Sequence, residues 1–210
     1  MYIPNNYKNE DANDIKNFIK HHSFGILVTH GDGKTLATHI PLELAINKRG
    51  KEVLQGHIAK KNPQKENFKN NTEVLCIFSG PHSYVSSSWY TYEEVPTWNY
   101  IAVHVYGKLK VIAGEALVSV LKELVDKHEA ASENPIAVEQ LSDKTMRQVN
   151  GIVGFEIEIT DIQATKKLSQ GEDAENYANI ISKLENKNEG NANAIATCMK
   201  DLKIKNEHKR

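Results

Sequence analysis

Aromatic side chains gather in one segment of this 210-residue chain. Seven of its fifteen Phe, Tyr and Trp residues fall between positions 84 and 106: Tyr84, Trp89, Tyr90, Tyr92, Trp98, Tyr100 and Tyr106. Flat aromatic faces can stack on a planar ligand, and the tyrosine hydroxyl groups can orient it. The same composition also suits a self-packed loop or a subunit interface. Both interpretations stand: a wall for a planar ligand, or a packing surface.

A second group of residues has the chemistry to hold an anion. Lys60, Lys61 and Asn62 lie where a predicted strand ends and a short helix begins. Ammonium groups and the free backbone N–H groups of a helix start both attract phosphate. The segment therefore predicts a phosphate cradle, and the alternative is a solvated turn with surface lysines.

Other kinds of site are excluded by residue type and spacing. The cysteines, Cys76 and Cys198, form no CxxC pair, and the nine histidines show no metal-ligand spacing, so we predict no metal site. The chain contains no nucleotide phosphate loop, nucleophile elbow or zinc-protease motif, so we predict no catalytic residue. Lys and Arg number 26 against 27 Asp and Glu, which gives no global basic field for nucleic acid. Without a signal peptide or a membrane-length apolar run, the sequence predicts a cytoplasmic protein with no membrane contact.

Hydrophobic patterning predicts the elements that position these residues. Apolar residues at helical spacing predict helices over 11–22 and 115–129. Alternation predicts six strands, at 24–29, 36–44, 52–58, 74–78, 100–112 and 152–162. The first three strands follow one another through turns and are expected to form a meander. This order favours an α+β protein, a small antiparallel β-barrel with flanking helices.

The remaining segments lack strand period. Between the strands that end at 78 and begin at 100 lies a loop of about twenty residues, a length that is usually functional in compact domains. After about residue 174 the chain becomes helical and polar, with a last helix over 194–202 and a polar tail. We therefore predict two parts, a barrel domain over 1–172 and a C-terminal helical appendage with its tail over 173–210.

Three segments taken together resemble a known family. They are HIAKKNPQ at 57–64, GPHSYVSSSWY at 80–90, and VPTWNY at 95–100, the last followed by His104 and by Tyr106 with Gly107. In this order they are similar to the PaiB-type FMN-binding negative transcriptional regulators. MYIP at 1–4, IVGFEI at 152–157 and KLSQ at 167–170 extend the likeness over essentially residues 1–172.

The resemblance implies a fold, a cofactor and a function. It implies a six-stranded FMN-binding split β-barrel, related to pyridoxamine-phosphate-oxidase-like proteins, that forms a homodimer with FMN between the subunits. It also implies repression of genes for degradative enzymes and sporulation, and we expect this to involve sensing of flavin state or a metabolite. One alternative is a flavin-dependent oxidoreductase, either a flavin reductase or a pyridoxamine-phosphate-oxidase-like enzyme. The other is a bare dimerisation scaffold.

Direct DNA contact has the weakest support in the sequence. No helix-turn-helix pattern is evident. Residues 200–210, with five Lys or Arg against two Asp or Glu, are a local basic patch that could contact phosphate, and the alternative is a solvated tail. Any contact with nucleic acid is expected to be confined to local patches such as this one.

Residue chemistry and the resemblance together define a predicted FMN site. Lys60, Asn62 and the nearby backbone are expected to hold the phosphate. Strand residues 38–40 are expected to lie against the isoalloxazine, and other members of the set complete the site, some of them from the partner subunit. The full predicted set is Thr38, His39, Ile40, His57, Ala59, Lys60, Asn62, Tyr84, Trp98, Asn99, Lys167 and Gln170.

Overall fold

Seven β-strands dominate the computed structural model, which describes residues 1–69 and 71–207, with 204–207 described by backbone alone. The strands are β1 (Phe24–Gly31), β2 (Lys34–Pro41), β3 (Glu43–Ile46), β4 (Glu52–Ala59), β5 (Thr72–Val85), β6 (Thr97–Ile112) and β7 (Ile152–Lys167). The α-helices are α1 (Ala12–His21), α2 (Glu115–Glu129), α3 (Asp143–Met146), α4 (Ala174–Asn186) and α5 (Gly190–Glu207). Five 3-10 helices complete the described elements: η1 (Asn5–Tyr7), η2 (Pro63–Asn67), η3 (Ser87–Trp89), η4 (Val138–Gln140) and η5 (Arg147–Gly151).

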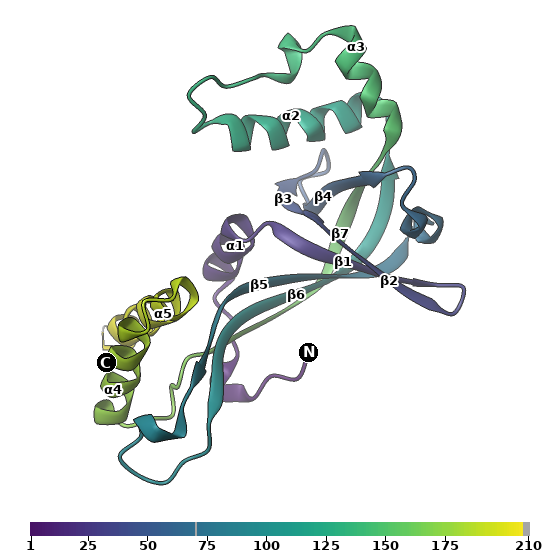
Figure 1. The fold of residues 1–210 in the computed structure, drawn as a ribbon. Helices are drawn as coiled ribbons and strands as arrows, with labels where there is room; N and C mark the ends of the chain where they lie inside the picture. Colours follow the sequence, from purple (N-terminus) through teal and green to yellow (C-terminus); the bar gives the residue numbers. More distant parts are fainter. Residues whose placement is uncertain (70, 208–210) are drawn as a thin grey trace. The chain divides into compact units, whose positions relative to one another are not determined.

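The strands form one antiparallel sheet in the order β2-β1-β5-β6-β7-β4-β3 (Figure 1). The α+β class is confirmed, but the prediction of six strands is wrong. The strand expected over 36–44 is broken at Leu42, a fully buried residue whose N–H donates to the Ser23 carbonyl at 2.8 Å. Before this break the chain pairs with β1, and after it with β4. The expected three-stranded meander is therefore two separate hairpins.

The break explains how the sheet approaches a barrel without closing. Although β2 and β3 follow each other in the chain, they are the two edges of the sheet. The edges come close near Gly56 of β4, where an added Cβ would lie 3.0 Å from the Pro41 carbonyl oxygen. Glycine is needed here because any side chain would push β2 away from β4.

Nearly half of the long loop expected between 78 and 100 is strand. β5 continues through Val85, and β6 starts at Thr97, which leaves only residues 86–96 with the short η3 between them. Ser83 and Val85 are buried while His82 and Tyr84 are exposed, so the segment does alternate. The alternation is hard to recognise in the sequence because Gly80 and Pro81 are typical of turns, although both lie within β5.

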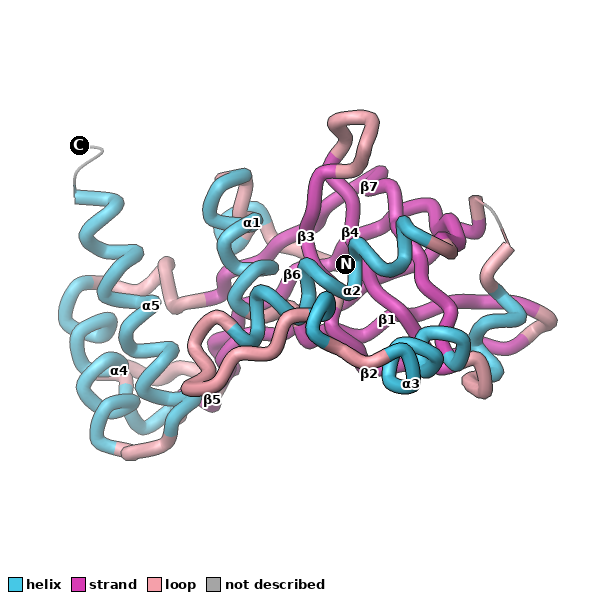
Figure 2. The backbone as a smooth tube through the Cα atoms, turned by 90° about the horizontal axis from the view of Figure 1, so that it is seen from above, coloured by secondary structure: helices cyan, strands magenta, loops and turns pink. Residues whose placement is uncertain are grey.

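The two main predicted helices are confirmed, each within one residue of the expected bounds. Asp11 caps α1, since its carboxylate accepts from Asn13 N–H at 3.0 Å and Asp14 N–H at 3.1 Å. At the other end of the chain α4 and α5 pack against each other, as Figure 2 shows, with Ile180, Leu184 and Ile195 fully buried. No helix in the part of the chain described here is long and apolar enough to cross a membrane.

The chain divides into two compact units. Unit 1 comprises residues 1–15, 79–103 and 163–210, and unit 2 comprises 16–78 and 104–162. β5, β6 and β7 each contribute residues to both units. The expected division into 1–172 and 173–210 stays a prediction, and residues 208–210 of the predicted tail lie outside the described residues.

Candidate functional site

The predicted site residues fall into two groups, one in each unit. In unit 2 are Thr38, His39, Ile40, His57, Ala59, Lys60 and Asn62. In unit 1 are Tyr84, Trp98, Asn99, Lys167 and Gln170. Each group is built by local contacts that can be followed separately.

Thr38 and Asn62 meet in unit 2, although 24 positions separate them. The Asn62 amide donates to Thr38 Oγ1 at 2.9 Å, and the Asn62 carbonyl oxygen accepts from Gln64 N–H at 2.9 Å. The second bond makes Asn62 the cap of η2. One asparagine therefore fixes the end of the β4–η2 turn against β2.

Gln64 completes this network, and residue type alone did not identify it. Its side chain is 1% exposed. Its amide donates to the carbonyl oxygens of Leu27 at 3.0 Å and Leu36 at 3.3 Å, and its oxygen accepts from Thr38 Oγ1 at 2.5 Å. The signal was available in the motif HIAKKNPQ, where Gln64 is the last residue.

Alternation along β2 separates the three residues expected to lie against a flavin ring. Thr38 and Ile40 point to the inner face, where Ile40 is buried, and His39 points to the outer face. There His39 stacks on Phe24 of β1, with ring centroids 6.4 Å apart and an interplanar angle of 29°. Only His39 of the three therefore presents its side chain on the exposed face.

The predicted phosphate cradle has cations without partners. Lys60 and Lys61 are exposed, and within the described ranges neither side chain makes a hydrogen bond or an ion pair. η2 spans only five residues and is capped by Asn62, so its dipole adds little charge. The two ammonium groups supply the positive charge of this turn.

His57 and Ala59 lie on the face of β4 opposite the buried Leu54 and Ile58. His57 lines a small cavity of about 140 Å³ beneath α2, with Glu43 and Lys127 among its other walls. Burial lowers the pKa of His57 below its ordinary value, which favours the neutral ring. The structure thus directs this side chain toward α2.

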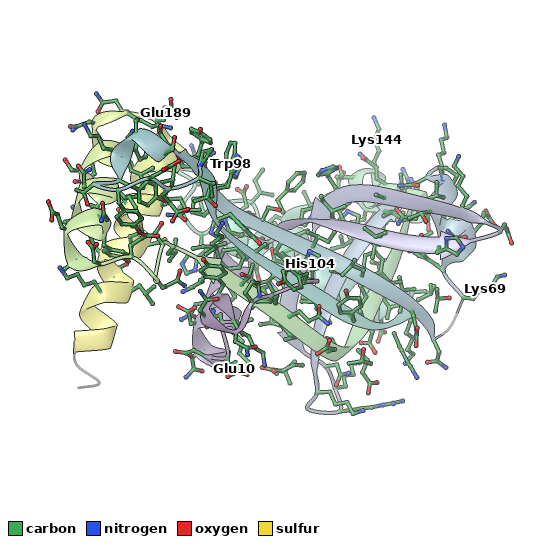
Figure 3. The ribbon with its side chains drawn as sticks, turned by 90° about the horizontal axis from the view of Figure 1, so that it is seen from below. Glu10, Lys69, Trp98, His104, Lys144 and Glu189 are labelled. Atoms are coloured by element: carbon green, nitrogen blue, oxygen red, sulfur yellow. The ribbon has the colours of Figure 1, made fainter. Side chains whose placement is uncertain are left out.

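Aromatic side chains of unit 1 gather around Trp98 at the start of β6, as the stick view shows (Figure 3). Trp98 is 53% exposed, and its ring lies 5.9 Å from that of Tyr84 and 6.1 Å from that of His82. An exposed indole held by two neighbours can stack on a planar ligand.

The remaining predicted residues of unit 1 are engaged inside the unit. Asn99 is fully buried, and its amide and oxygen both bond to Ser169 Oγ, at 2.9 and 3.2 Å. Lys167 donates to Thr97 Oγ1 and lies 5.7 Å from the centre of the Tyr7 ring. Gln170 folds back on its own turn, accepting from Leu168 N–H at 2.7 Å. Asn99 therefore links the start of β6 to the turn that follows β7.

An open antiparallel sheet with a hairpin at each edge is the arrangement of a split β-barrel. The chain belongs to the family described as "Putative FMN-binding domain", whose model matches residues 1–161. FMN is its cofactor. A relative from Bacillus subtilis (strain 168), "Protease synthase and sporulation protein PAI 2", is 43% identical over 203 residues, covering 96% of this chain and 97% of the relative.

Solved structures share the fold. The FAD and heme binding protein from Mycobacterium smegmatis superposes with a TM-score of 0.62 at 14% identity, covering 82% of this chain and 78% of that one. The flavocytochrome Anf3 from Azotobacter vinelandii gives a TM-score of 0.61 at 14% identity, covering 84% and 78%. These likenesses concern the fold alone.

The residues present fit FMN. A phosphate requires cations and hydrogen-bond donors, which the unpaired ammonium groups of Lys60 and Lys61 and the Asn62 amide supply. The isoalloxazine requires flat or apolar surfaces, which His39 with Phe24, and separately Trp98 with Tyr84, provide. When bound, FMN supplies a redox-active ring.

Proposed function

We propose that this chain is a negative transcriptional regulator that carries FMN and represses genes for degradative enzymes and sporulation. The observation that carries the proposal is the 43% identity, over nearly the whole of both chains, to a protein named for protease synthesis and sporulation. Flavin redox state or a bound metabolite is the signal we assign to it. No observation favours the oxidoreductase alternative over this role.

A homodimer is part of the proposal, and the outer face of unit 2 supports it. Pairing places Ile26, His39 and Ile77 in one row, and Val28, Ala37 and Leu75 in the next. We call these six residues, with the adjacent Phe24, the outer sheet face. Phe24 is 68% exposed, and none of the others is fully buried. A continuous apolar face of this kind is typical of a subunit interface.

We place FMN at that interface. The turn at 60–62 is the proposed phosphate cradle, in which Thr38 holds the Asn62 amide, and His39 is the proposed contact of the flavin ring. Trp98 and Tyr84 are assigned to the ring from the partner subunit, because a stacking wall needs exposed aromatic faces and these two have them. The other predicted residues are assigned to holding these ligands in place, without a direct contact to FMN: His57, Ala59, Asn99, Lys167 and Gln170.

DNA contact stays a prediction at residues 200–210, whose side chains are described only as far as Lys203. The balanced charge of the chain restricts any such contact to a local patch. The cytoplasmic location also stays a prediction.

The regulatory role is tested by complementation. In a Bacillus subtilis strain that lacks the 43% identical relative, expression of this chain should lower extracellular protease and sporulation relative to an empty vector. Unchanged protease and sporulation, with the chain present as a soluble, flavin-bearing protein, would reject the role. An NAD(P)H turnover assay on the same purified protein distinguishes an oxidoreductase, which would consume NAD(P)H steadily.

Thr38 offers a test of the assigned FMN ligands. Thr38→Val keeps the shape of the side chain but removes the hydroxyl at the centre of the Asn62 and Gln64 contacts. We expect it to weaken FMN binding by about tenfold in a fluorescence titration, because the Asn62 amide loses the acceptor that fixes it in the phosphate cradle. Thr35→Val is the matched control on the same strand, since Thr35 is exposed and its hydroxyl group hydrogen-bonds to His30, outside the proposed site. Equal FMN affinity in both variants would remove Thr38 from the site.

A further inference from the structure

Unit 2 contains a second concave site, at the first turns of α2. The cavity measures about 440 Å³ and lies between the end of β6, the start of α2, η5 and the start of β7. Figure 1 shows these elements meeting where the chain returns over α2 to α3 and β7. The volume falls within the range of small-molecule sites, roughly 300–1,000 Å³.

The lining of this cavity is apolar apart from two side chains, Lys60 and Asn150. Val111 at its rim is 38% exposed, and Val118, Met146 and Ile152 are only half-buried. Apolar side chains that meet in a concave surface and stay open to solvent gain free energy when an apolar group covers them.

The walls are held in place by packing and backbone contacts. α2 sits so close to β7 that a Cβ at Gly154 would lie 2.4 Å from Leu117 Cδ1. On the other side, Lys60 N–H donates to the Gly151 carbonyl at 2.8 Å, which ties the β4 end to η5. Ser142 caps α3 through Thr145 N–H at 3.3 Å, just before Met146. The cavity is therefore formed before any ligand enters.

Charge selects the kind of ligand. The neighbouring cavity that His57 lines contains two glutamates, Glu43 and Glu123, and one lysine, Lys127. Among the described residues, the lining of the α2 cavity has no carboxylate and one ammonium group, that of Lys60. Within residues 1–69 and 71–203 that ammonium group has no ion-pair partner. An anionic head is thus favoured in the α2 cavity over the cavity at His57.

We propose that the α2 cavity binds a small carboxylic acid with a compact apolar body, either aromatic or branched aliphatic. The Lys60 ammonium group pairs with the carboxylate, the Asn150 amide donates a second hydrogen bond, and Val118, Met146 and Ile152 cover the apolar body. This site is separate from the proposed FMN site. In place of the role proposed for Lys60 in the phosphate cradle, its ammonium group pairs with the carboxylate, and Lys61 and Asn62 remain for the phosphate.

The chain's methionines allow a direct test, because there are three of them and only Met146 lines the cavity. The flavin-loaded protein is labelled at the methionine methyl carbons with ¹³C and titrated with benzoate, and the Met146 signal is assigned with Met146→Leu. We expect a saturable shift of the Met146 methyl signal and none of Met199, which is buried in unit 1. Benzamide, the neutral analogue, should bind about tenfold more weakly because it forms no ion pair.

Matched variants decide the role of Lys60. Lys60→Gln should remove the preference for benzoate over benzamide, whereas Lys61→Gln, at the exposed neighbour, should keep it. Val118→Trp, which fills the cavity, should abolish the shift with both ligands. The proposal is overturned if benzoate leaves Met146 unshifted, if Met199 shifts equally, or if Lys60→Gln binds benzoate as the parent does. Flavin absorbance recorded in the same samples shows separately whether FMN stays bound.

Discussion

At the scale of single residues, Gln64 links the predicted phosphate turn to the core of unit 2. Gln64→Leu leaves the carbonyl oxygens of Leu27 and Leu36 buried without that donor. An unsatisfied buried polar group costs about 1–3 kcal/mol, so we expect the free energy of unfolding in urea to fall by about 2 kcal/mol. The control is Lys65→Ala, at an exposed residue whose ion pair with Glu66 is also exposed. We expect Lys65→Ala to change stability by less than about 0.5 kcal/mol, and a similar loss in both variants would contradict the role of Gln64.

Residue chemistry predicted one contact between the proposed site residues but not the direction of every side chain. The motif around 57–64 brought Asn62 and Thr38 into one proposal, and the structure places them in contact. Gln64 was missed because glutamine usually lies on surfaces, although it is the last residue of the motif HIAKKNPQ. Asn99 was taken as a ligand, yet its side chain is fully buried against Ser169. The direction of a polar side chain depends on contacts far along the chain, which local patterns do not contain.

At the scale of elements, the closeness of β6 and β7 depends on Gly107. An added Cβ there would lie 2.5 Å from Ile157 Cγ2 and 2.6 Å from the Glu158 carbonyl oxygen. Gly107→Ala must therefore push the strands apart, and we expect a loss of about 1–3 kcal/mol, seen as a lower Tm. Gly151→Ala is the matched control, because a Cβ at Gly151 meets no atom within 4 Å. Equal Tm values for the two variants would show that β6 and β7 can accommodate a methyl group at position 107 without loss of stability.

Periodicity predicted those elements whose two faces differ. The faces of α1 and α2 differ strongly, and both helices were placed within a residue of their observed bounds. The break at Leu42 was missed because apolar residues alternate straight through it, while the change of pairing partner from β1 to β4 is a tertiary event. The strand character of 79–85 was missed because Gly80 and Pro81 resemble a turn.

At the scale of the whole molecule, the sequence of β1 bears on the oligomeric state. Its sequence FGILVT has apolar residues on both faces, so alternation cannot tell which face is inside. The structure settles one face, where Leu27 is fully buried, and leaves Ile26 and Phe24 on the outer sheet face. A strand that is apolar on both sides is expected to be covered on both sides, and a second copy of this chain supplies the second cover in the proposed homodimer.

Charge placed on the outer sheet face tests that assembly. Burying a carboxylate without a partner at an interface is strongly unfavourable, so Ile26→Glu should convert the dimer to a monomer of 23.6 kDa in sedimentation experiments. Ile46→Glu makes the same change at an isoleucine of β3 that is 62% exposed and lies outside this face, and it should leave the dimer intact. Because FMN is proposed to contact both subunits, FMN affinity should fall with Ile26→Glu and not with Ile46→Glu. A parent protein that sediments as a monomer, or an Ile26→Glu variant that stays dimeric with normal circular dichroism, would place the flavin within a single subunit.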